Sequence, residues 1–114
     1  MDCSVVIPVY YNAGSLRTTY EKVVAVLRKH SSVKEYELLF IDDGSGDNSY
    51  SELTDLRNDY PDDIRLIKFT RNFGQLAAIK AGYQYAKGKC IINISADLQD
   101  PPELIGQMLD DYFH

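Results

Sequence analysis

The stretch Cys90-Ile91-Ile92-Asn93-Ile94 is a short apolar run that predicts a strand buried on both faces of a sheet. A polar loop, Ser95-Ala96-Asp97-Leu98-Gln99-Asp100, follows it, and Pro101-Pro102 suits the start of a helix. The loop therefore lies at the end of a strand, where open α/β sheets bind ligands. Asp97 and Gln99 are two residues apart, so both can offer oxygen ligands to one hard cation. The same stretch is equally typical of an acidic turn before a helix.

Three earlier segments repeat this order of strand, polar loop and helix. Apolar runs at Cys3–Pro8, Tyr36–Ile41 and Ile64–Phe69 predict strands, and the third alternates in a way that favours a place near a sheet edge. Helical patterns follow each strand, and the third of them is expected to bury the face formed by Leu76, Ile79, Tyr83 and Ala86. Strict β-α-β-α-β-α-β-α alternation predicts a parallel, Rossmann-like α/β sheet with right-handed crossovers and helices on both faces.

Length and composition place the chain among ordinary globular domains. It has 114 residues, 45% of them hydrophobic and 25% charged, so we expect one domain over residues 1–114. Its net charge of −5 argues against nucleic acid as a partner, because that would call for a basic stripe. Cys3 and Cys90 each begin an apolar run and are expected to be buried, reduced thiols.

The loops after the four predicted strands carry the polar residues of a candidate nucleotide site. Parallel strands end at one edge, so the loops should converge there. A tyrosine there can contact a base, an aspartate can accept hydrogen bonds from base or ribose, and an arginine can pair with a phosphate. The candidates are Pro8, Tyr10, Asn12, Asp42, Asp43, Arg71, Asn72, Asp97 and Gln99.

Each loop also has a plain structural explanation. Asp42-Asp43-Gly44-Ser45 is compatible with a simple turn, Arg71 with a solvated charge, and Tyr10 with a brace for the first helix. Two other site types fit poorly. A dinucleotide-binding glycine loop at residues 44–49 would follow the wrong strand and place acids beside a pyrophosphate. A phosphoreceiver domain would need its acidic pair after the first strand, and here the pair follows the second.

Four segments taken together carry a resemblance that none carries alone. They are Val5-Val6-Ile7-Pro8-Val9-Tyr10-Tyr11-Asn12, Ile41-Asp42-Asp43-Gly44-Ser45, Arg71-Asn72-Phe73-Gly74-Gln75, and Ser95-Ala96-Asp97-Leu98-Gln99-Asp100-Pro101-Pro102-Glu103. In this order they resemble family 2 glycosyltransferases of the GT-A fold, over essentially the whole chain. The subgroup that the chain is most similar to makes polyprenyl-phosphate sugars, as dolichol-phosphate mannose synthases and bactoprenol glucosyltransferases do.

The resemblance implies an inverting hexosyltransferase that uses a UDP- or GDP-sugar donor and Mg²⁺ or Mn²⁺. It implies that Pro8, Tyr10 and Asn12 line the nucleotide pocket, with Asp42 and Asp43 near the base or ribose. It also implies that Arg71 and Asn72 lie near the diphosphate, and that Asp97 and Gln99 are the metal ligands. Ser95 departs from the family pattern, because many members have an acid at that position.

The family's acceptor site and catalytic base come from a segment after the metal loop. We therefore expect this chain to be the donor-binding portion of a longer enzyme, with no catalytic residue of its own and no sugar transfer when isolated. The parent is expected at the cytoplasmic face of a membrane, in cell-envelope polysaccharide biosynthesis. An exposed sheet edge would favour homo-oligomers. Three alternatives stay open: a glycan or polysaccharide acceptor, a non-catalytic nucleotide-binding module, and an interaction domain with solvated acidic loops.

Overall fold

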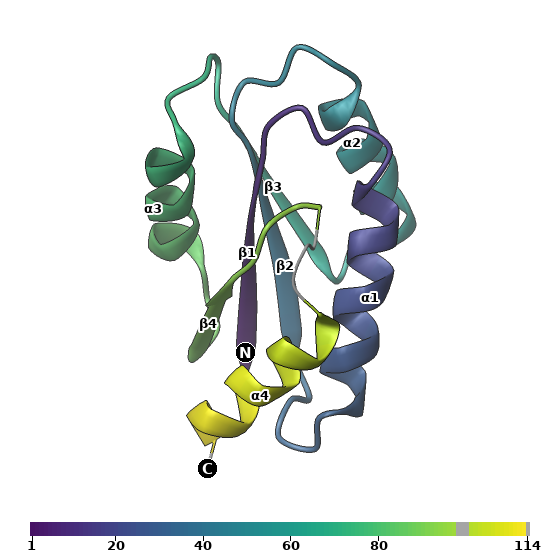
Figure 1. Cartoon of the computed structure of the whole chain (residues 1–114), viewed down its shortest axis with the longest axis vertical. Coiled ribbons are helices and arrows are strands. Elements are labelled where there is room, and N and C mark those ends of the chain that lie inside the picture. The colour runs from purple at the N-terminus through teal and green to yellow at the C-terminus, as the bar shows by residue number, and fades with distance from the viewer. Residues whose placement is uncertain (98–100, 114) are drawn as a thin grey trace.

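A computed structural model of the chain describes residues 1–97 and 101–113. The predicted alternation of strands and helices is confirmed (Figure 1). The elements are β1 (Cys3–Val9), α1 (Leu16–Lys29), β2 (Tyr36–Asp42), α2 (Ser49–Asp59), β3 (Ile64–Lys68), α3 (Gln75–Tyr85), β4 (Cys90–Asn93) and α4 (Pro102–Phe113). Among the described residues, no helix is both long and apolar enough to cross a membrane.

The four strands form one parallel sheet in the order β3-β2-β1-β4. β3 lies at one edge, as its alternating pattern predicted. β4 lies at the other edge, and the prediction that it is buried on both faces is wrong. Cys90 and Ile92 face the core, whereas Ile91 on the other face is 37% exposed. α4 packs on the core face of β4, whereas α3, on the other face of the sheet, lies over β1 and β2, so Ile91 is left partly exposed.

The strand order explains the distribution of the helices (Figure 1). The connections from β1 to β2 and from β2 to β3 run in one direction across the sheet, and β3 to β4 runs back. Right-handed crossovers therefore put α1 and α2 on one face and α3 on the other. α4 returns to the first face, where Ile105 and Leu109 are buried in the larger core cluster. The smaller cluster lies under α3 and consists of Val6, Leu39, Ile41 and Ala78.

α3 packs on the sheet through its small residues, and this corrects the face expected from the sequence. Ala78 and Gly82 are buried. A Cβ added to Gly82 would lie 2.2 Å from Val6 Cγ1, so only glycine permits this close approach. Leu76 is consequently 84% exposed and Tyr83 49% exposed, whereas Ile79 is half-buried and Ala86, just after the helix, packs against the smaller cluster as expected. The helix is apolar on more than one side, and the side with the smallest residues fits closest to the sheet.

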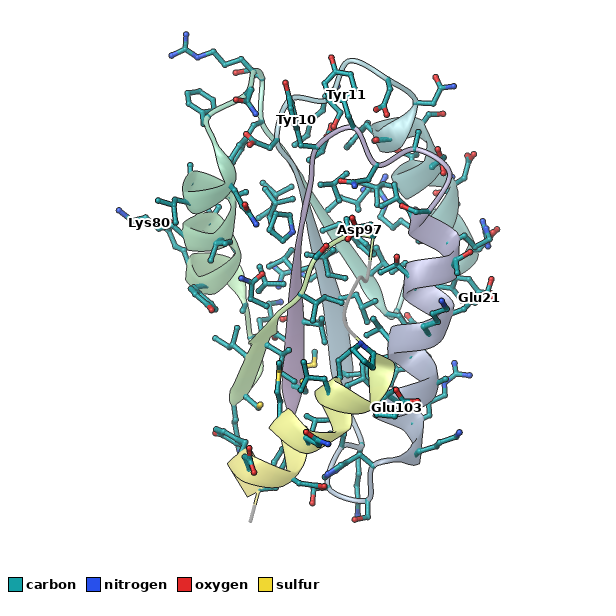
Figure 2. All side chains as sticks on the ribbon, viewed as in Figure 1. Tyr10, Tyr11, Glu21, Lys80, Asp97 and Glu103 are labelled. Atoms are coloured by element: carbon teal, nitrogen blue, oxygen red, sulfur yellow. The ribbon has the colours of Figure 1, made fainter. Side chains whose placement is uncertain are left out.

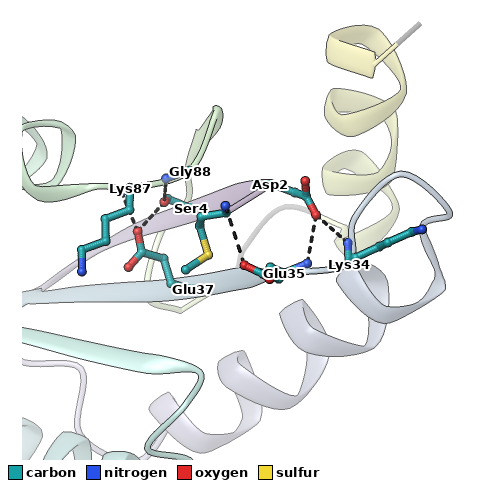
Figure 3. Close-up of polar contacts among 8 residues, drawn as sticks. Asp2, Ser4, Lys34, Glu35, Glu37, Lys87 and Gly88 are labelled. Atoms are coloured by element: carbon teal, nitrogen blue, oxygen red, sulfur yellow. Dashed lines mark hydrogen bonds and ion pairs between the residues drawn. The ribbon is translucent and has the colours of Figure 1, made fainter.

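A buried carboxylate ties the far end of α3 to the beginning of the sheet (Figure 3). Glu37 accepts hydrogen bonds from the Ser4 hydroxyl, from Arg65 Nη1 at 2.8 Å and from the Lys87 amide at 2.8 Å. Burial raises the pKa of Glu37, but these bonds outweigh it and hold the pKa below its ordinary value. The cluster lies opposite the polar loops and has a structural role.

Candidate functional site

The loops that follow β1, β2 and β3 are bonded to one another. The Tyr11 amide donates to Ser45 Oγ at 3.0 Å, and the Asn12 amide donates to Ser49 Oγ at 2.9 Å. Asp47 accepts from the Ala13 amide at 3.3 Å, and the hydroxyl of Ser49 lowers the pKa of Asp47. The convergence expected from parallel strands is therefore present, and it is built from backbone donors and short side chains.

Asp43 is the centre of the connection between β2 and the loop before α3. Its Oδ1 accepts from the Phe73 amide at 2.8 Å, and its Oδ2 accepts from the Gly74 amide at 3.1 Å and from Asn72 Nδ2 at 3.0 Å. Asp43 is 3% exposed. Both oxygens are occupied by the protein, so the contacts of Asp43 favour a role in shaping the loop. Gly44 completes the junction: its φ is +75°, and a Cβ there would lie 2.3 Å from the Arg71 carbonyl carbon.

Asp42 points to the other face of the sheet and is fully buried. Its Oδ1 accepts from the Ser45 amide at 3.2 Å. Its Oδ2 has no hydrogen-bond partner among the described residues. A buried carboxylate oxygen without a partner is costly, and functional sites are among the places where such groups occur.

A cavity of about 390 Å³ opens at the carboxyl ends of the strands. Its size lies within the range of small-molecule sites. It lies where the ends of β1 and β4 meet, which is the point where the strand order reverses and where open α/β sheets bind ligands. Gly74, at φ 101°, is the N-cap of α3, and the first turn of this helix forms part of the cavity wall. The backbone amides of a helix N-terminus favour an anion at this position. The lining residues are Pro8, Val9, Tyr10, Asn12, Asp43, Asn72, Gly74, Gln75, Ser95 and Ala96.

The structure brings together some of the predicted site residues and leaves others outside. Five of the predicted residues line the cavity, namely Pro8, Tyr10, Asn12, Asp43 and Asn72. Asp42 is buried beside it. Arg71 is exposed, and its guanidinium lies 4.9 Å from the ring centre of Phe73. Asp97 is exposed in the segment that follows β4 (Figure 2). The hydroxyl of the lining residue Ser95 donates to Asp97 Oδ1. Gln99 lies outside the described residues.

Sequence reasoning missed several lining positions, chiefly Gln75 and Ala96. Gln75 reaches the cavity because it begins α3 directly after the loop that Asp43 holds. Ala96 is held by Thr19 of α1, whose hydroxyl donates to the Ala96 carbonyl at 2.5 Å. A glycine followed by a helical pattern was a usable signal for Gln75. The contact between residues 19 and 96 has no local signal.

The chemistry of these donors fits a divalent cation only in part. Among the described residues, no three His, Cys, Asp or Glu side chains gather as a metal site. Asp97 is the exposed carboxylate beside the cavity. Mg²⁺ commonly uses one or two carboxylates together with substrate phosphates, so a single carboxylate at this position is compatible with an ion shared with a bound diphosphate.

Comparison with known proteins gives matches along almost the whole chain. The model of the family described as "Glycosyl transferase family 2" matches residues 4–113. An uncharacterized glycosyltransferase, YkcC of Bacillus subtilis, is 43% identical over 107 residues, 94% of this chain and 32% of the relative. An undecaprenyl-phosphate 4-deoxy-4-formamido-L-arabinose transferase of Pectobacterium atrosepticum is 42% identical over the same shares of the two chains. This chain thus spans about a third of the length of these relatives.

Solved structures with the same fold have low sequence identity. A mannosyltransferase of Pyrobaculum calidifontis in complex with GDP-Man and Mn²⁺ superposes with a TM-score of 0.72 at 19% identity, over 87% of this chain and 32% of that one. S. aureus TarS 1-349 in complex with UDP-GlcNAc has a TM-score of 0.68 at 19% identity, over 85% of this chain and 27% of that one. At this identity the likeness shows the fold alone.

Proposed function

This chain belongs to glycosyl transferase family 2 and has the fold of GT-A glycosyltransferases, and from that premise we propose that it forms the donor-binding part of an inverting, metal-dependent enzyme. The donor is a UDP- or GDP-sugar, and the acceptor of the whole enzyme is a polyprenyl phosphate. The observation that carries the proposal is the cavity where β1 and β4 end, because four loops meet there with polar side chains and a helix N-terminus.

Two groups of residues bind the two parts of the donor, the nucleoside and the diphosphate. Pro8, Tyr10 and Asn12 form the wall at the end of β1 and take the nucleoside. Asn72 and the first turn of α3 form the opposite wall of the cavity. They bind the diphosphate, because the amides at a helix N-terminus carry partial positive charge. Arg71 approaches the phosphates by turning its exposed side chain away from Phe73.

Asp42 and Asp43 support this arrangement from beneath. The Asp43 oxygens accept hydrogen bonds from the Phe73 and Gly74 amides, and Asp42 Oδ1 accepts from the Ser45 amide, so the two carboxylates fix the loops around the cavity. Both residues thus contribute to nucleotide binding through the loops that they order. This role differs from the direct contact with base or ribose that the resemblance implies.

Asp97, together with Gln99, is the proposed ligand of Mg²⁺ or Mn²⁺. When bound, the ion would neutralise charge on the diphosphate leaving group. The Ser95 hydroxyl donates to Asp97 and so orients its carboxylate. With one described carboxylate at this position, we expect the ion and the nucleotide to bind together and neither to bind tightly alone.

Support for the acceptor comes from the relatives, several of which are named undecaprenyl-phosphate transferases at 41–42% identity. The acceptor site and the catalytic base are assigned to the remainder of a longer enzyme, so this chain alone should not transfer sugar. A parent that acts on a lipid phosphate works at a membrane surface.

The test is a calorimetric titration of the chain with UDP and with GDP, each with and without Mn²⁺. We expect one nucleotide to bind in a Mn²⁺-dependent manner, and Asp97→Asn to weaken that binding by about tenfold or more, since a charged interaction contributes about 1.5–3 kcal/mol. Asp55→Asn, which removes an exposed carboxylate on α2, is the matched control and should bind as the wild type does. Nucleotide binding that does not depend on Mn²⁺, or a folded chain that binds neither nucleotide, would refute the proposal.

A further inference from the structure

The outer side of α3 carries apolar side chains where a solvated helix face would carry polar ones. Leu76 and Tyr83 lie on this side, and Phe73 precedes it, 51% exposed. The helix can leave these residues exposed because Ala78 and Gly82 make its contact with the sheet. Large exposed apolar side chains grouped on one helix face mark a surface that binds something.

The same region is strongly cationic in an otherwise acidic chain. Residues 64–96 contain six Lys and Arg and no Asp or Glu, whereas the remaining residues contain six Lys and Arg and seventeen Asp and Glu. Lys80 lies one turn from both Leu76 and Tyr83 and points away from the sheet, on the opposite side of the molecule from Glu21 of α1 (Figure 2).

Two cations flank the apolar side chains: Arg71 lies against the Phe73 ring, and Lys80 lies one turn from Leu76 and Tyr83. Within residues 1–97 and 101–113, neither has a carboxylate within ion-pair distance. Both are exposed. We call the five residues Arg71, Phe73, Leu76, Lys80 and Tyr83 the α3 surface.

The α3 surface begins at the rim of the candidate donor cavity. Asn72, Gly74 and Gln75 line that cavity, and they alternate along the chain with Phe73 and Leu76 of the α3 surface. A partner that covers the α3 surface would therefore lie directly beside the mouth of the cavity.

We propose that the α3 surface docks on an anionic lipid bilayer. Aromatic and aliphatic side chains enter the interfacial region of a bilayer, and Lys and Arg beside them contact anionic headgroups. The charge complementarity selects this partner: in a symmetric pair of chains, Lys80 of one copy would meet the equivalent cations of the other. The inference deepens the proposed function and rests on it in one respect, namely the assignment of the cavity to the donor. Docking would turn the mouth of the donor cavity towards the membrane, from which a lipid-phosphate acceptor comes.

A tryptophan probe tests the docking directly. The chain has no tryptophan, so Leu76→Trp at a position that is 84% exposed gives a single emission from the centre of the α3 surface. With vesicles of equal parts phosphatidylglycerol and phosphatidylcholine we expect a blue shift, which high salt should reverse. Vesicles of phosphatidylcholine alone should give no blue shift. Lys22→Trp on α1 is the matched probe and should give no shift with either vesicle.

Charge variants then locate the contact, measured by co-sedimentation with the mixed vesicles. Lys80→Gln and Arg71→Gln should each weaken binding roughly fivefold, because one cation near an anionic surface contributes about that factor. Lys22→Gln and Lys29→Gln, which remove exposed cations from α1, should change binding by less than about twofold.

The outcomes separate this inference from the proposed function, since the vesicles contain neither nucleotide nor polyprenyl phosphate. Equal binding to both vesicle types, equal effects of the α1 and α3 variants, or no binding by the folded wild type would overturn it. Self-association that Leu76→Ser abolishes, without vesicle binding, would also overturn it and would make the α3 surface a contact between chains. The nucleotide titration in solution is unaffected by any of these results.

Discussion

Replacing Gly82 by alanine tests how α3 lies on the sheet. A Cβ at this position would be 2.2 Å from Val6 Cγ1, 3.1 Å from Val6 Cγ2 and 3.2 Å from Ile41 Cδ1. Val6 is fully buried and β-branched, so its side chain cannot rotate away. The alanine must therefore push the helix from the sheet or force Val6 off its rotamer.

The expected magnitude follows from comparison with Gly106 of α4. Each Gly→Ala change in a helix gains about 1 kcal/mol of helix propensity. At Gly106 the nearest atom to an added Cβ is Val26 Cγ1 at 3.8 Å, which is ordinary contact, so Gly106→Ala should be stabilising by about that amount. At Gly82, overpacking costs about 1–3 kcal/mol, so Gly82→Ala should be less stable than Gly106→Ala by about 1–3 kcal/mol.

Urea unfolding followed by far-ultraviolet circular dichroism measures both variants, and thermal midpoints should differ by about 4 °C per kcal/mol. The double variant Val6→Ala, Gly82→Ala gives a further check, because removal of both Val6 methyls should make the alanine at position 82 favourable relative to Val6→Ala alone. If Gly82→Ala and Gly106→Ala stabilise the chain equally, α3 does not pack through Gly82. The outward direction of Leu76, and with it the α3 surface, would then be refuted.

Three further predictions concern the polar and thiol groups. Asp43→Asn replaces one acceptor by a donor, so amide exchange at Gly74 should accelerate about tenfold or more, and nucleotide binding should weaken with it; unchanged exchange would contradict the role given to Asp43. The pKa of Glu37 is held below its ordinary value of 4.5 in the folded chain, so its contribution to stability is present above that pH and is lost as the pH falls through the lowered value. Glu37→Gln should accordingly show a flatter loss of unfolding free energy in that acidic range, and an unaltered pH profile would argue against the linkage. Burial raises the pKa of Cys3 to about 12 and also raises that of Cys90, so neither thiol should react with Ellman's reagent faster than the chain unfolds.

The strands and helices could be predicted from local sequence, because each apolar run is long enough to show its period. The parallel sheet, the number of units and the polar loops at the ends of the strands all follow from that alternation. Pro8, Tyr10, Asn12, Asp43 and Asn72 were predicted as site residues because they stand in those loops, and all five line the cavity. Arg71 stood in the same kind of loop, yet its side chain is exposed against Phe73.

Two features of the site could not be predicted because they depend on how elements approach one another. The predicted face of Leu76, Ile79, Tyr83 and Ala86 has helical spacing, but so do Ala78 and Gly82, which are the buried residues of α3. Of the predicted four, Ala86 packs against the core, whereas Leu76 and Tyr83 are exposed. The choice between the two faces is made by the close fit of Gly82 against Val6. The Phe73 and Gly74 amides likewise donate to Asp43, which is about thirty positions away in the chain. No local sequence pattern predicts a contact at that separation.

The secondary structure, the parallel sheet and the family could be predicted from the residues alone, because they follow from hydrophobic period and from short motifs in order. Which strands are neighbours is set by packing across the whole sheet, and the site depends on that order. The order β3-β2-β1-β4 places the end of β1 beside the end of β4, so that Tyr10 and Ser95 line one cavity although they are far apart in the chain. Among the helices that the structure describes, only α3 lies on its face of the sheet, and Leu76 and Lys80 are exposed there. Strand order is selected by packing and handedness across the whole sheet, and these act between residues that no local pattern links.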